Sequence, residues 1–216
     1  NSSAPFMKKI FMDAIETGRL YNLEYKNKGI EAPSCLKTKF KFYDKTVFTL
    51  LKKVLGIERG RLFPVAGAPL SDTVNEFLQS VNIPIVYGYG LSETTATVCF
   101  YPEIGFQFGS IGEIMPGVEV KIDESNGEIL VKGKTVTTGY YNKPEENARS
   151  FTEDGFFRTG DAGRMEGNIL FFTERIKDLY KTSNGKYIAP QAIEIEMGSD
   201  KYIEQIAVIG DQRKFV

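Results

Sequence analysis

The stretch with the most reactive and ligand-binding groups is Tyr87 to Thr95, which reads YGYGLSETT and follows the apolar run Ile83 to Val86. Its aromatic rings can stack on a purine base, and its glycines let the backbone approach a phosphate. Ser92 and Glu93 add a hydroxyl and a carboxylate, which together can hold a phosphate oxygen and a Mg²⁺ ion. The simpler alternative is a glycine-rich turn that ends a buried strand, with Ser92 capping the next helix. Taken alone, the stretch leaves both interpretations open.

Two polar clusters further along the chain suit the same kind of ligand: Phe156 to Asp161 (FFRTGD) and Glu174 to Asp178 (ERIKD). An ionised Asp161 accepts two hydrogen bonds, which matches the vicinal hydroxyls of a ribose. Arg175 adds a fixed fork of donors for the same sugar or for a phosphate. Each cluster by itself is more simply a polar loop or a solvated sheet edge. In their order along the chain, and together with YGYGLSETT, they outline a bound adenylate.

The first half of the chain must position these groups through helices and buried strands. Apolar residues recur at helical spacing over residues 6–28 and again over 44–55. A short buried strand is expected at 61–66, a helix at 71–81, and a second strand at 83–86 leading into YGYGLSETT. The succession of strand, loop, helix and strand is typical of an open, largely parallel α/β sheet.

The second half has a different pattern, in which short runs of alternating apolar and polar residues are separated by turns that contain glycine. The runs Val118 to Ile122, Glu128 to Val131 and Asn168 to Phe172 predict a small antiparallel β subdomain. Asn126-Gly127 predicts a hairpin whose two central residues both have positive φ. A helix is expected from residue 190 to 200 and a strand from 205 to 210. We therefore expect α/β subdomain residues at 1–103, a β subdomain at 104–177, and the start of a small α+β C-terminal domain at 178–216.

Composition excludes several classes of function. The chain has 216 residues, of which 42% are hydrophobic and 25% charged, as in soluble globular proteins of one or two domains. It has no histidine, which excludes Ser-His-Asp and Cys-His catalysis and the commonest zinc ligands. Cys35 and Cys99 form neither a disulfide framework nor a metal-ligand spacing. No apolar run approaches the roughly 18 residues that span a bilayer, so the cytoplasm is the expected compartment.

Charge is nearly balanced overall, with a net charge of -1, which argues against a nucleic-acid partner. It is unevenly distributed, because residues 1–60 carry 12 Lys and Arg against 6 Asp and Glu. Such basic helices could lie against an acidic partner or at the inner face of an anionic membrane, as a peripheral contact. A solvated helical face is the simpler explanation.

Seven motifs occur in a fixed order: GAPL (67–70), YGYGLSETT (87–95), GEIMPGVEVKI (112–122), GEILVKG (127–133), TGYYNKPE (138–145), GFFRTGD (155–161) and ERIKDLYKTSNGKYIAP (174–190). This set resembles the acyl- and aryl-CoA synthetase superfamily of adenylate-forming, AMP-binding enzymes, and the resemblance covers nearly the whole chain from about Arg61. The stretches TSNGKYIAPQAIE (182–194) and YIEQIAVIGDQRK (202–214) most resemble the long-chain fatty acid:CoA ligase branch.

The resemblance implies a role for individual positions around the nucleotide. Gly67, Ala68 and Pro69 would line the adenine and acyl-adenylate site with backbone atoms. Gly88 and Gly90 would belong to the same nucleotide site.

The remaining roles concern the base, the sugar, the metal and the later half-reaction. Tyr89 would flank the adenine, Ser92 would contact the α-phosphate, Glu93 would bind Mg²⁺, and Asp161 with Arg175 would hold the ribose. Lys177 would be the hinge of the C-terminal domain, and Lys181 a basic residue that acts in thioester formation. The loop at 182–186 would carry Gly185 toward the pantetheine tunnel.

The implied reaction has two steps and uses ATP, Mg²⁺, coenzyme A and a fatty acid. The carboxylate attacks the α-phosphorus of ATP to give acyl-AMP and pyrophosphate, and the thiol of coenzyme A then displaces AMP. The family's Ser/Thr/Gly-rich phosphate loop and its late lysine have no counterpart in these 216 residues. We therefore expect a fragment with little ligase activity by itself. Two alternatives stay open: another adenylating branch, either an aminoacyl-adenylating domain or an acyl-AMP ligase, and a nonenzymatic module that binds a membrane or a partner.

Overall fold

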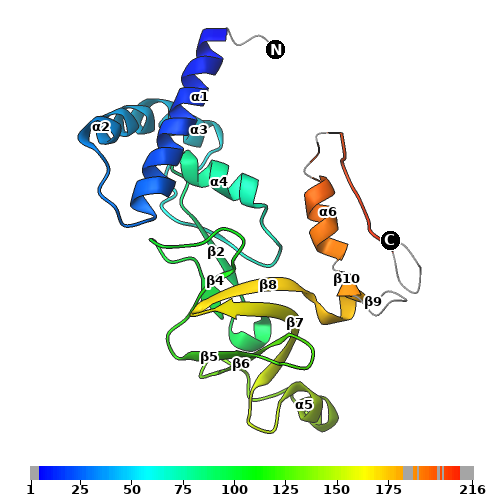
Figure 1. Cartoon of the computed structure of the whole chain (residues 1–216). Coiled ribbons are helices and arrows are strands. Elements are labelled where there is room, and N and C mark those ends of the chain that lie inside the picture. The colour runs from blue at the N-terminus through cyan, green and yellow to red at the C-terminus, as the bar shows by residue number, and fades with distance from the viewer. Residues whose placement is uncertain (1–4, 182–186, 189, 199, 201, 210–216) are drawn as a thin grey trace. The chain divides into compact units, whose positions relative to one another are not determined.

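The computed structural model describes residues 5–181, 187–188, 190–198, 200 and 202–209 (Figure 1). The chain divides into two compact units. The first comprises Asn1–Gly88 and Phe100–Gly109, and the second comprises Tyr89–Cys99 and Ser110–Val216. Within the described residues, no helix is both long and apolar enough to cross a membrane.

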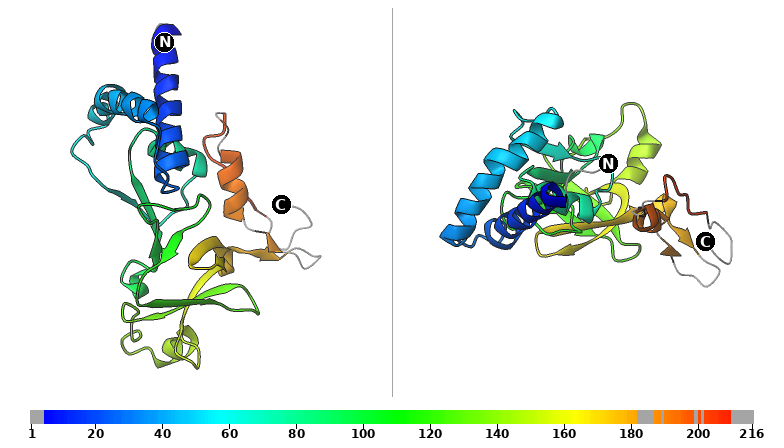
Figure 2. Two further views of the ribbon diagram at one scale, coloured as in Figure 1. Left: turned by 60° about the vertical axis from the view of Figure 1, so that its left-hand side comes forward. Right: turned by 90° about the horizontal axis from the view of Figure 1, so that it is seen from above.

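Among its described residues, the first unit contains four α-helices, two π-helical segments and a parallel strand pair. Figure 2 shows the ribbon of the chain in two further views. The elements of the first unit are α1 (Pro5–Arg19), a π-helical segment (Leu20–Lys26), α2 (Ser34–Tyr43), a second π-helical segment (Asp44–Phe48), α3 (Thr49–Val54), β1 (Phe63–Val65), α4 (Asp72–Ser80) and β2 (Ile85–Tyr89), whose last residue belongs to the second unit. Strand β1 pairs in parallel with β2, with Phe63 opposite Ile85. This confirms the predicted strand, loop, helix and strand.

Helices α1, α2 and α4 pack around one apolar core in this unit. Its fully buried members are Ala14, Phe40, Tyr43, Phe48, Val81, Ile83 and Ile85. The helical stretch predicted at 44–55 forms as the second π-helical segment and α3, and it continues α2, which begins upstream at Ser34. Phe40 and Tyr43 lie one helical turn apart in α2, and both are buried in the core. Pro33 precedes the first residue of α2, a position where a proline does not disturb the helix.

Close packing of α1 on α4 makes Gly18 intolerant of a side chain. A Cβ at Gly18 would lie 1.9 Å from the carbonyl oxygen of Ser80 and 3.1 Å from the ring of Phe48. We predict that Gly18→Ala destabilises the first unit by about 3 kcal/mol, because the two helices must move apart. Urea unfolding followed by far-UV circular dichroism measures the change. Met12→Ala, on the exposed side of α1, is the control and should change stability by less than about 0.5 kcal/mol.

The second unit is built on an antiparallel sheet with the strand order β4-β8-β7-β6-β5. Its elements are a 3₁₀ turn (Ser92–Thr94), β3 (Cys99–Phe100, whose second residue belongs to the first unit), β4 (Gly112–Ile114), β5 (Val118–Ile122), β6 (Glu128–Gly133), α5 (Pro144–Ser150), β7 (Phe157–Glu166) and β8 (Ile169–Arg175). Ile129, Leu130 and Val131 are buried in succession on β6, which lies between β7 and β5. The antiparallel β subdomain is thus confirmed.

The β5–β6 hairpin forms, but the predicted turn type is wrong. Gly127 has a φ of +75°, whereas Asn126 is not among the residues with positive φ. The Gly127 amide donates to the carbonyl of Asp123 at 2.8 Å, and the Asn126 carboxamide oxygen accepts from the amide of Glu128. The loop is therefore longer than a two-residue turn, and only its last residue needs the left-handed region that glycine tolerates.

The chain after β8 forms a 3₁₀ turn (Ile176–Asp178), the two-residue strands β9 (Tyr180–Lys181) and β10 (Tyr187–Ile188), and helix α6 (Pro190–Gly198). The helix was expected, and it is anchored by the fully buried carboxylate of Glu174, which accepts from the amide of Gln191 at 3.0 Å.

The strand predicted at 205–210 is wrong, because residues 205–209 have no strand structure. The amide of Val208 donates to the Glu194 side chain at 2.8 Å instead of to a neighbouring strand. The fold class is the predicted one: a parallel α/β part, then an antiparallel β part, then a short mixed α and β segment. The residue boundaries of the three predicted domains stay a prediction.

Candidate functional site

A tyrosine and a buried carboxylate meet in the second unit, although 72 positions separate them in the chain. The Tyr89 hydroxyl donates to Oδ2 of Asp161 at 2.6 Å. Asp161 is only 3% exposed, and Tyr89 is half-buried. Burial raises the pKa of the Tyr89 phenol, and the negative charge and hydrogen bond of Asp161 raise it further. The YGYGLSETT stretch and the FFRTGD cluster therefore each contribute one residue to a polar pair, in which the tyrosine stays neutral.

Arg175 joins this pair from the neighbouring strand. It lies opposite Asp161 in the β7–β8 register, and its Nε is 3.7 Å from Oδ1 of Asp161. The Arg175 side chain is about half exposed (51%), whereas the Asp161 side chain is 5% exposed. The Asp161 carboxylate is thus buried, while the exposed Arg175 guanidinium keeps donors available to a ligand.

Asp161 is brought into this position by an irregularity in β7. Glu128 pairs with Ala162 and Leu130 pairs with Arg158, so four steps along β7 face two steps along β6. Residues 159–161 therefore bulge out of the ladder, and Gly160 has a φ of +73°. A bulge of this kind re-aims side chains, and here it frees Asp161 from regular pairing with β6.

The loop that follows Tyr89 has a tightly constrained backbone. The Thr94 hydroxyl accepts from the amide of Leu91 at 2.9 Å, and the amide of Ala96 donates to the Leu91 carbonyl at 3.0 Å. Thr95 and Ala96 have φ values of +53° and +76°, which cost conformational energy in residues other than glycine. Gly90 passes so close to Ala96 that an added Cβ would lie 2.2 Å from its carbonyl oxygen.

Ser92 and Glu93 form the first part of the 3₁₀ turn in this loop. Leu91 occupies the N-cap position, so the simpler interpretation of Ser92 as a helix cap is wrong. The Ser92 side chain is exposed and has no hydrogen-bond partner in the part of the chain that the structure describes. Glu93 is half-buried, and its Oε1 accepts from the hydroxyl of Tyr140 at 2.8 Å.

Tyr140 is a residue near the site that sequence reasoning did not single out. It lies in the motif TGYYNKPE, but nothing in the local pattern indicated that its hydroxyl reaches back to Glu93, 47 positions upstream. The backbone carbonyl of Glu93 also accepts from the amide of Thr137 at 2.7 Å. Glu93 is therefore held by two contacts, one from Tyr140 in the TGYYNKPE segment and one from Thr137 just before it.

The Glu93–Tyr140 contact has a measurable signature. The hydrogen bond to Glu93, followed by partial burial and the charge of Glu93, raises the pKa of the Tyr140 phenol to about 12. We predict that Glu93→Gln lowers this pKa toward the ordinary value of about 10, because the anionic acceptor is removed. Carbon-13 NMR titration of Cζ-labelled tyrosine measures it, with Glu119→Gln on β5 as a control that should leave the pKa unchanged. A Tyr140 pKa that stays near 12 in Glu93→Gln would contradict the geometry.

The described surroundings of Glu93 offer a magnesium ion only a few protein ligands. Among the described residues, no group of three His, Cys, Asp or Glu side chains is placed to hold a metal. Glu93 is a single carboxylate with Oε1 occupied by Tyr140. This suits an ion that is held by one protein carboxylate together with substrate phosphates and water, which is the usual protein environment of Mg²⁺.

Four of the glycine, alanine and proline positions predicted to line the nucleotide belong to the first unit. Gly67, Ala68 and Pro69 form a loop in the first unit, where the Tyr87 hydroxyl contacts the Ala68 carbonyl at 3.4 Å. Gly88 is in β2 of the same unit.

The positions assigned to the hinge and to thioester formation follow β8. Lys177 is exposed in the 3₁₀ turn, and Lys181 is in β9, where its backbone pairs with Tyr187. The predicted pantetheine loop, 182–186 with Gly185, lies outside the described residues.

The family model of the AMP-binding enzymes matches residues 11–141, and the chain belongs to this family. It is 34% identical over 182 residues to the long-chain-fatty-acid–CoA ligase FadD15 of Mycobacterium bovis, which covers 84% of this chain and 30% of that protein. It is 36% identical over 159 residues to long-chain-fatty-acid–CoA ligase 1 of Saccharomyces cerevisiae, which covers 68% of this chain and 23% of that protein. The chain thus spans 23% to 30% of the length of these two relatives.

The fold also occurs in solved structures. The ATP-bound RpMatB-BxBclM chimera aligns with a TM-score of 0.63 and 31% identity, covering 76% of this chain and 36% of the chimera. The family was predicted from seven ordered motifs, and the comparisons confirm it.

Proposed function

We propose that this chain forms the adenylate-holding part of a ligase that activates long-chain fatty acids with ATP and transfers them to coenzyme A. One observation carries the proposal: Tyr89, Asp161 and Arg175 converge within one unit of an AMP-binding enzyme. The names of the relatives support the long-chain substrate class.

In this proposal the ribose is bound by a preorganised carboxylate. Asp161 would accept hydrogen bonds from the two ribose hydroxyls, with the Tyr89 hydroxyl already donating to Oδ2. Tyr89 would present its ring to the adenine, and Arg175 would donate to the sugar or the phosphate. Because Asp161 is already buried and held in one position, its side chain loses little conformational entropy when the ligand binds.

The phosphate would be handled by the exposed end of YGYGLSETT. The free hydroxyl of Ser92 would donate to the α-phosphate, and Glu93, fixed by Tyr140, would hold Mg²⁺. Bound there, the ion would supply charge neutralisation for the phosphate oxygens. The fatty acid carboxylate attacks the α-phosphorus, pyrophosphate leaves, and the thiol of coenzyme A then displaces AMP. Such a reaction can be catalysed by positioning the substrates and by stabilising the charge of the transition state, without a histidine as general base, and this chain has no histidine.

Three groups of residues complete the proposal. Gly67, Ala68, Pro69, Gly88 and Gly90 would line the nucleotide with backbone atoms. Lys177 would be the hinge that absorbs the rotation between the two half-reactions, and Lys181 would act in thioester formation. The cytoplasmic location, and the peripheral membrane contact through the basic helices of the first unit, stay predictions.

The decisive experiment separates this proposal from its alternatives. Purified complete gene product is supplied with palmitate, ATP and Mg²⁺, with coenzyme A present or omitted, and acyl-AMP and acyl-CoA are measured. Formation of palmitoyl-CoA is expected. Acyl-AMP that accumulates equally with and without coenzyme A would indicate an acyl-AMP ligase, and an amino acid as the preferred substrate would indicate an aminoacyl-adenylating enzyme. No AMP affinity and no adenylate would overturn the proposal and favour a nonenzymatic binding module.

A further inference from the structure

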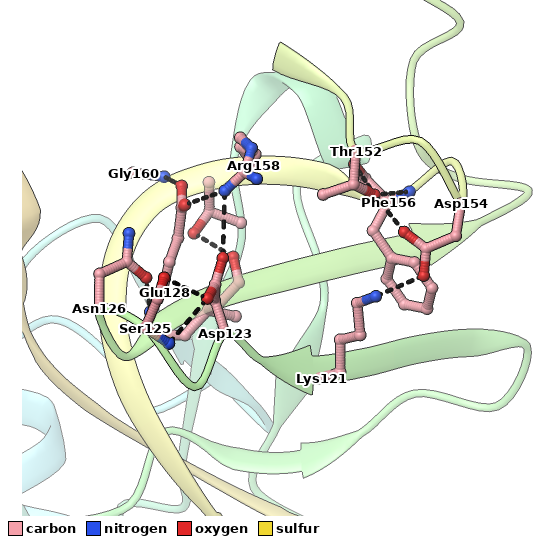
Figure 3. A network of polar contacts seen from close by, with 12 residues as sticks. Lys121, Asp123, Ser125, Asn126, Glu128, Thr152, Asp154, Phe156, Arg158 and Gly160 are labelled. Atoms are coloured by element: carbon pink, nitrogen blue, oxygen red, sulfur yellow. Dashed lines mark hydrogen bonds and ion pairs between the residues drawn. The ribbon is translucent and has the colours of Figure 1, made fainter. Parts of the chain in front are cut away.

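Glu128, at the start of β6, is a buried carboxylate whose two oxygens face different parts of the same turn (Figure 3). Its residue exposure is 6%. Oε1 accepts from the backbone amide of Gly160 at 2.9 Å, and Oε2 lies 2.8 Å from Nη1 of Arg158. Both partners flank Thr159 in the bulge of β7, so one side chain spans that bulge.

The Gly160 amide would otherwise lack a ladder partner. Between the paired positions Arg158 and Ala162, β7 carries extra residues that the facing segment of β6 cannot match. Gly160 is an exposed residue, so an amide that leaves the ladder here is satisfied either by a side chain or by water. The side chain of Glu128 supplies that acceptor in place of a strand carbonyl.

A second side chain closes the bulge from the other side. The Thr159 hydroxyl donates to the carbonyl of Ile129 at 2.7 Å and accepts from the amide of Asp161 at 3.1 Å. The two successive amides of Gly160 and Asp161 are therefore both held by side chains. Neither contact involves the Asp161 carboxylate, which remains directed at Tyr89.

The charge of Glu128 is balanced within the same network. Arg158 bridges Glu128 and Asp123, with Nη1 3.3 Å from Oδ2 of Asp123. The hydrogen bond to Glu128 raises the pKa of Arg158, so the guanidinium stays charged. Asp123 is itself held at the hairpin end by the amide and hydroxyl of Ser125. Removing a partner from a buried charge is costly, so the paired Arg158 and the Gly160 amide hold the Glu128 side chain in place across the bulge.

We propose that Glu128 is a positioning residue for ribose recognition: it fixes the Arg158–Gly160 bulge so that the Asp161 carboxylate is presented to the ribose hydroxyls. This inference rests on the proposed function for the identity of the ligand. It goes beyond that function because Glu128 would act through the backbone of Gly160 and would not touch the nucleotide.

The test compares two ligands that differ only in the groups concerned. Affinities for AMP and 2′,3′-dideoxy-AMP are measured by isothermal titration calorimetry on the complete gene product. The wild type is expected to prefer AMP by at least about 10- to 100-fold, the range for one lost hydrogen bond to a charged group, because the dideoxy ligand lacks both hydroxyls. In Glu128→Ala this preference should fall below about threefold, while the affinity for the dideoxy ligand changes little. Glu128→Gln keeps an oxygen for the Gly160 amide and should retain most of the preference.

Glu119→Ala is the matched control, because Glu119 is exposed on the adjacent strand β5. It should leave both affinities unchanged. If Glu128→Ala weakens both ligands equally, the role is merely structural, and the proposal is overturned. An unchanged AMP preference in Glu128→Ala overturns it as well.

A nucleotide-free measurement keeps this inference separate from the proposed function. Amide hydrogen exchange at Gly160 and Asp161 should accelerate at least about tenfold in Glu128→Ala and change less in Glu128→Gln, while exchange at Val131 is unaltered. If the wild type binds no AMP, the proposed function fails, and exchange alone decides whether Glu128 fixes the bulge. Equal exchange in wild type and Glu128→Ala would overturn the inference by itself.

Discussion

Asp161→Asn is expected to weaken AMP binding by about 10- to 100-fold, the largest effect on affinity among single substitutions in the described residues of the site. The change keeps the size of the side chain but replaces an anionic acceptor by an amide. The amide offers one oxygen where the carboxylate offers two, and Tyr89 already donates to one of these at 2.6 Å. A hydrogen bond from a ribose hydroxyl to a charged carboxylate is therefore lost. Isothermal titration calorimetry of the complete gene product with AMP measures the effect.

The same variant carries an internal check on the cause. Asp161 raises the pKa of the Tyr89 phenol by its charge and its hydrogen bond, so Asp161→Asn should lower that pKa, although burial keeps it above the ordinary value. Glu166→Gln makes the same charge change at the exposed end of β7. It should leave the AMP affinity within about twofold of wild type. Equal affinity losses in the two variants would show that net charge, and not the position of Asp161, controls binding.

Gly90→Ala is expected to destabilise the second unit by about 3 kcal/mol and to lower AMP affinity at least about tenfold. The added Cβ would lie 2.2 Å from the carbonyl oxygen of Ala96 and 2.8 Å from the Cα of Thr97, both backbone atoms. Overpacking against backbone is costly because no rotamer change relieves it. The loop from Leu91 to Ala96 must move, and Ser92 and Glu93 move with it. Urea unfolding measures the stability, and calorimetry with AMP measures the affinity.

Gly198→Ala is the control for this prediction. At the end of α6 the added Cβ would meet only the Cγ2 of Ile206, at an ordinary contact distance of 3.9 Å. Its stability should change by less than about 1 kcal/mol, with unchanged AMP affinity. If Gly90→Ala behaves like Gly198→Ala, the tight approach of Gly90 to Ala96 is not required for the site.

Most of the regular elements could be predicted from local pattern, because burial of one face imposes a period on the sequence. In Val118 to Ile122, apolar and polar residues alternate as in a strand with one buried face. Around Ala14, the apolar residues recur at helical spacing on the side that packs in the core. The failures have a common cause. The strand expected at residues 205–210 has the composition of a strand, but a strand needs a partner, and the amide of Val208 is taken by Glu194 instead.

The turn at Asn126-Gly127 is a second case in which contacts outside the local sequence decided the structure. The dipeptide predicts a hairpin correctly, whereas the loop length depends on how the two strands meet. Here the side chain of Asp123 binds the amide and the hydroxyl of Ser125, and Glu128 binds across the sheet to Gly160. The contact of Glu128 with Gly160 joins the end of the loop to β7, 32 residues later in the chain, and a local pattern cannot indicate it.

By itself the sequence determined the family, most of the regular elements, the absence of histidine chemistry and a set of candidate residues for an adenylate site. These properties depend on residue type and on order along the chain. Only the tertiary structure decided that Tyr89 donates to Asp161, that Tyr140 holds Glu93, and that Glu128 spans the bulge before Asp161. Each of these contacts joins positions more than 30 residues apart. The bulge of β7 that precedes Asp161 is, in addition, a strand irregularity that local periodicity does not indicate.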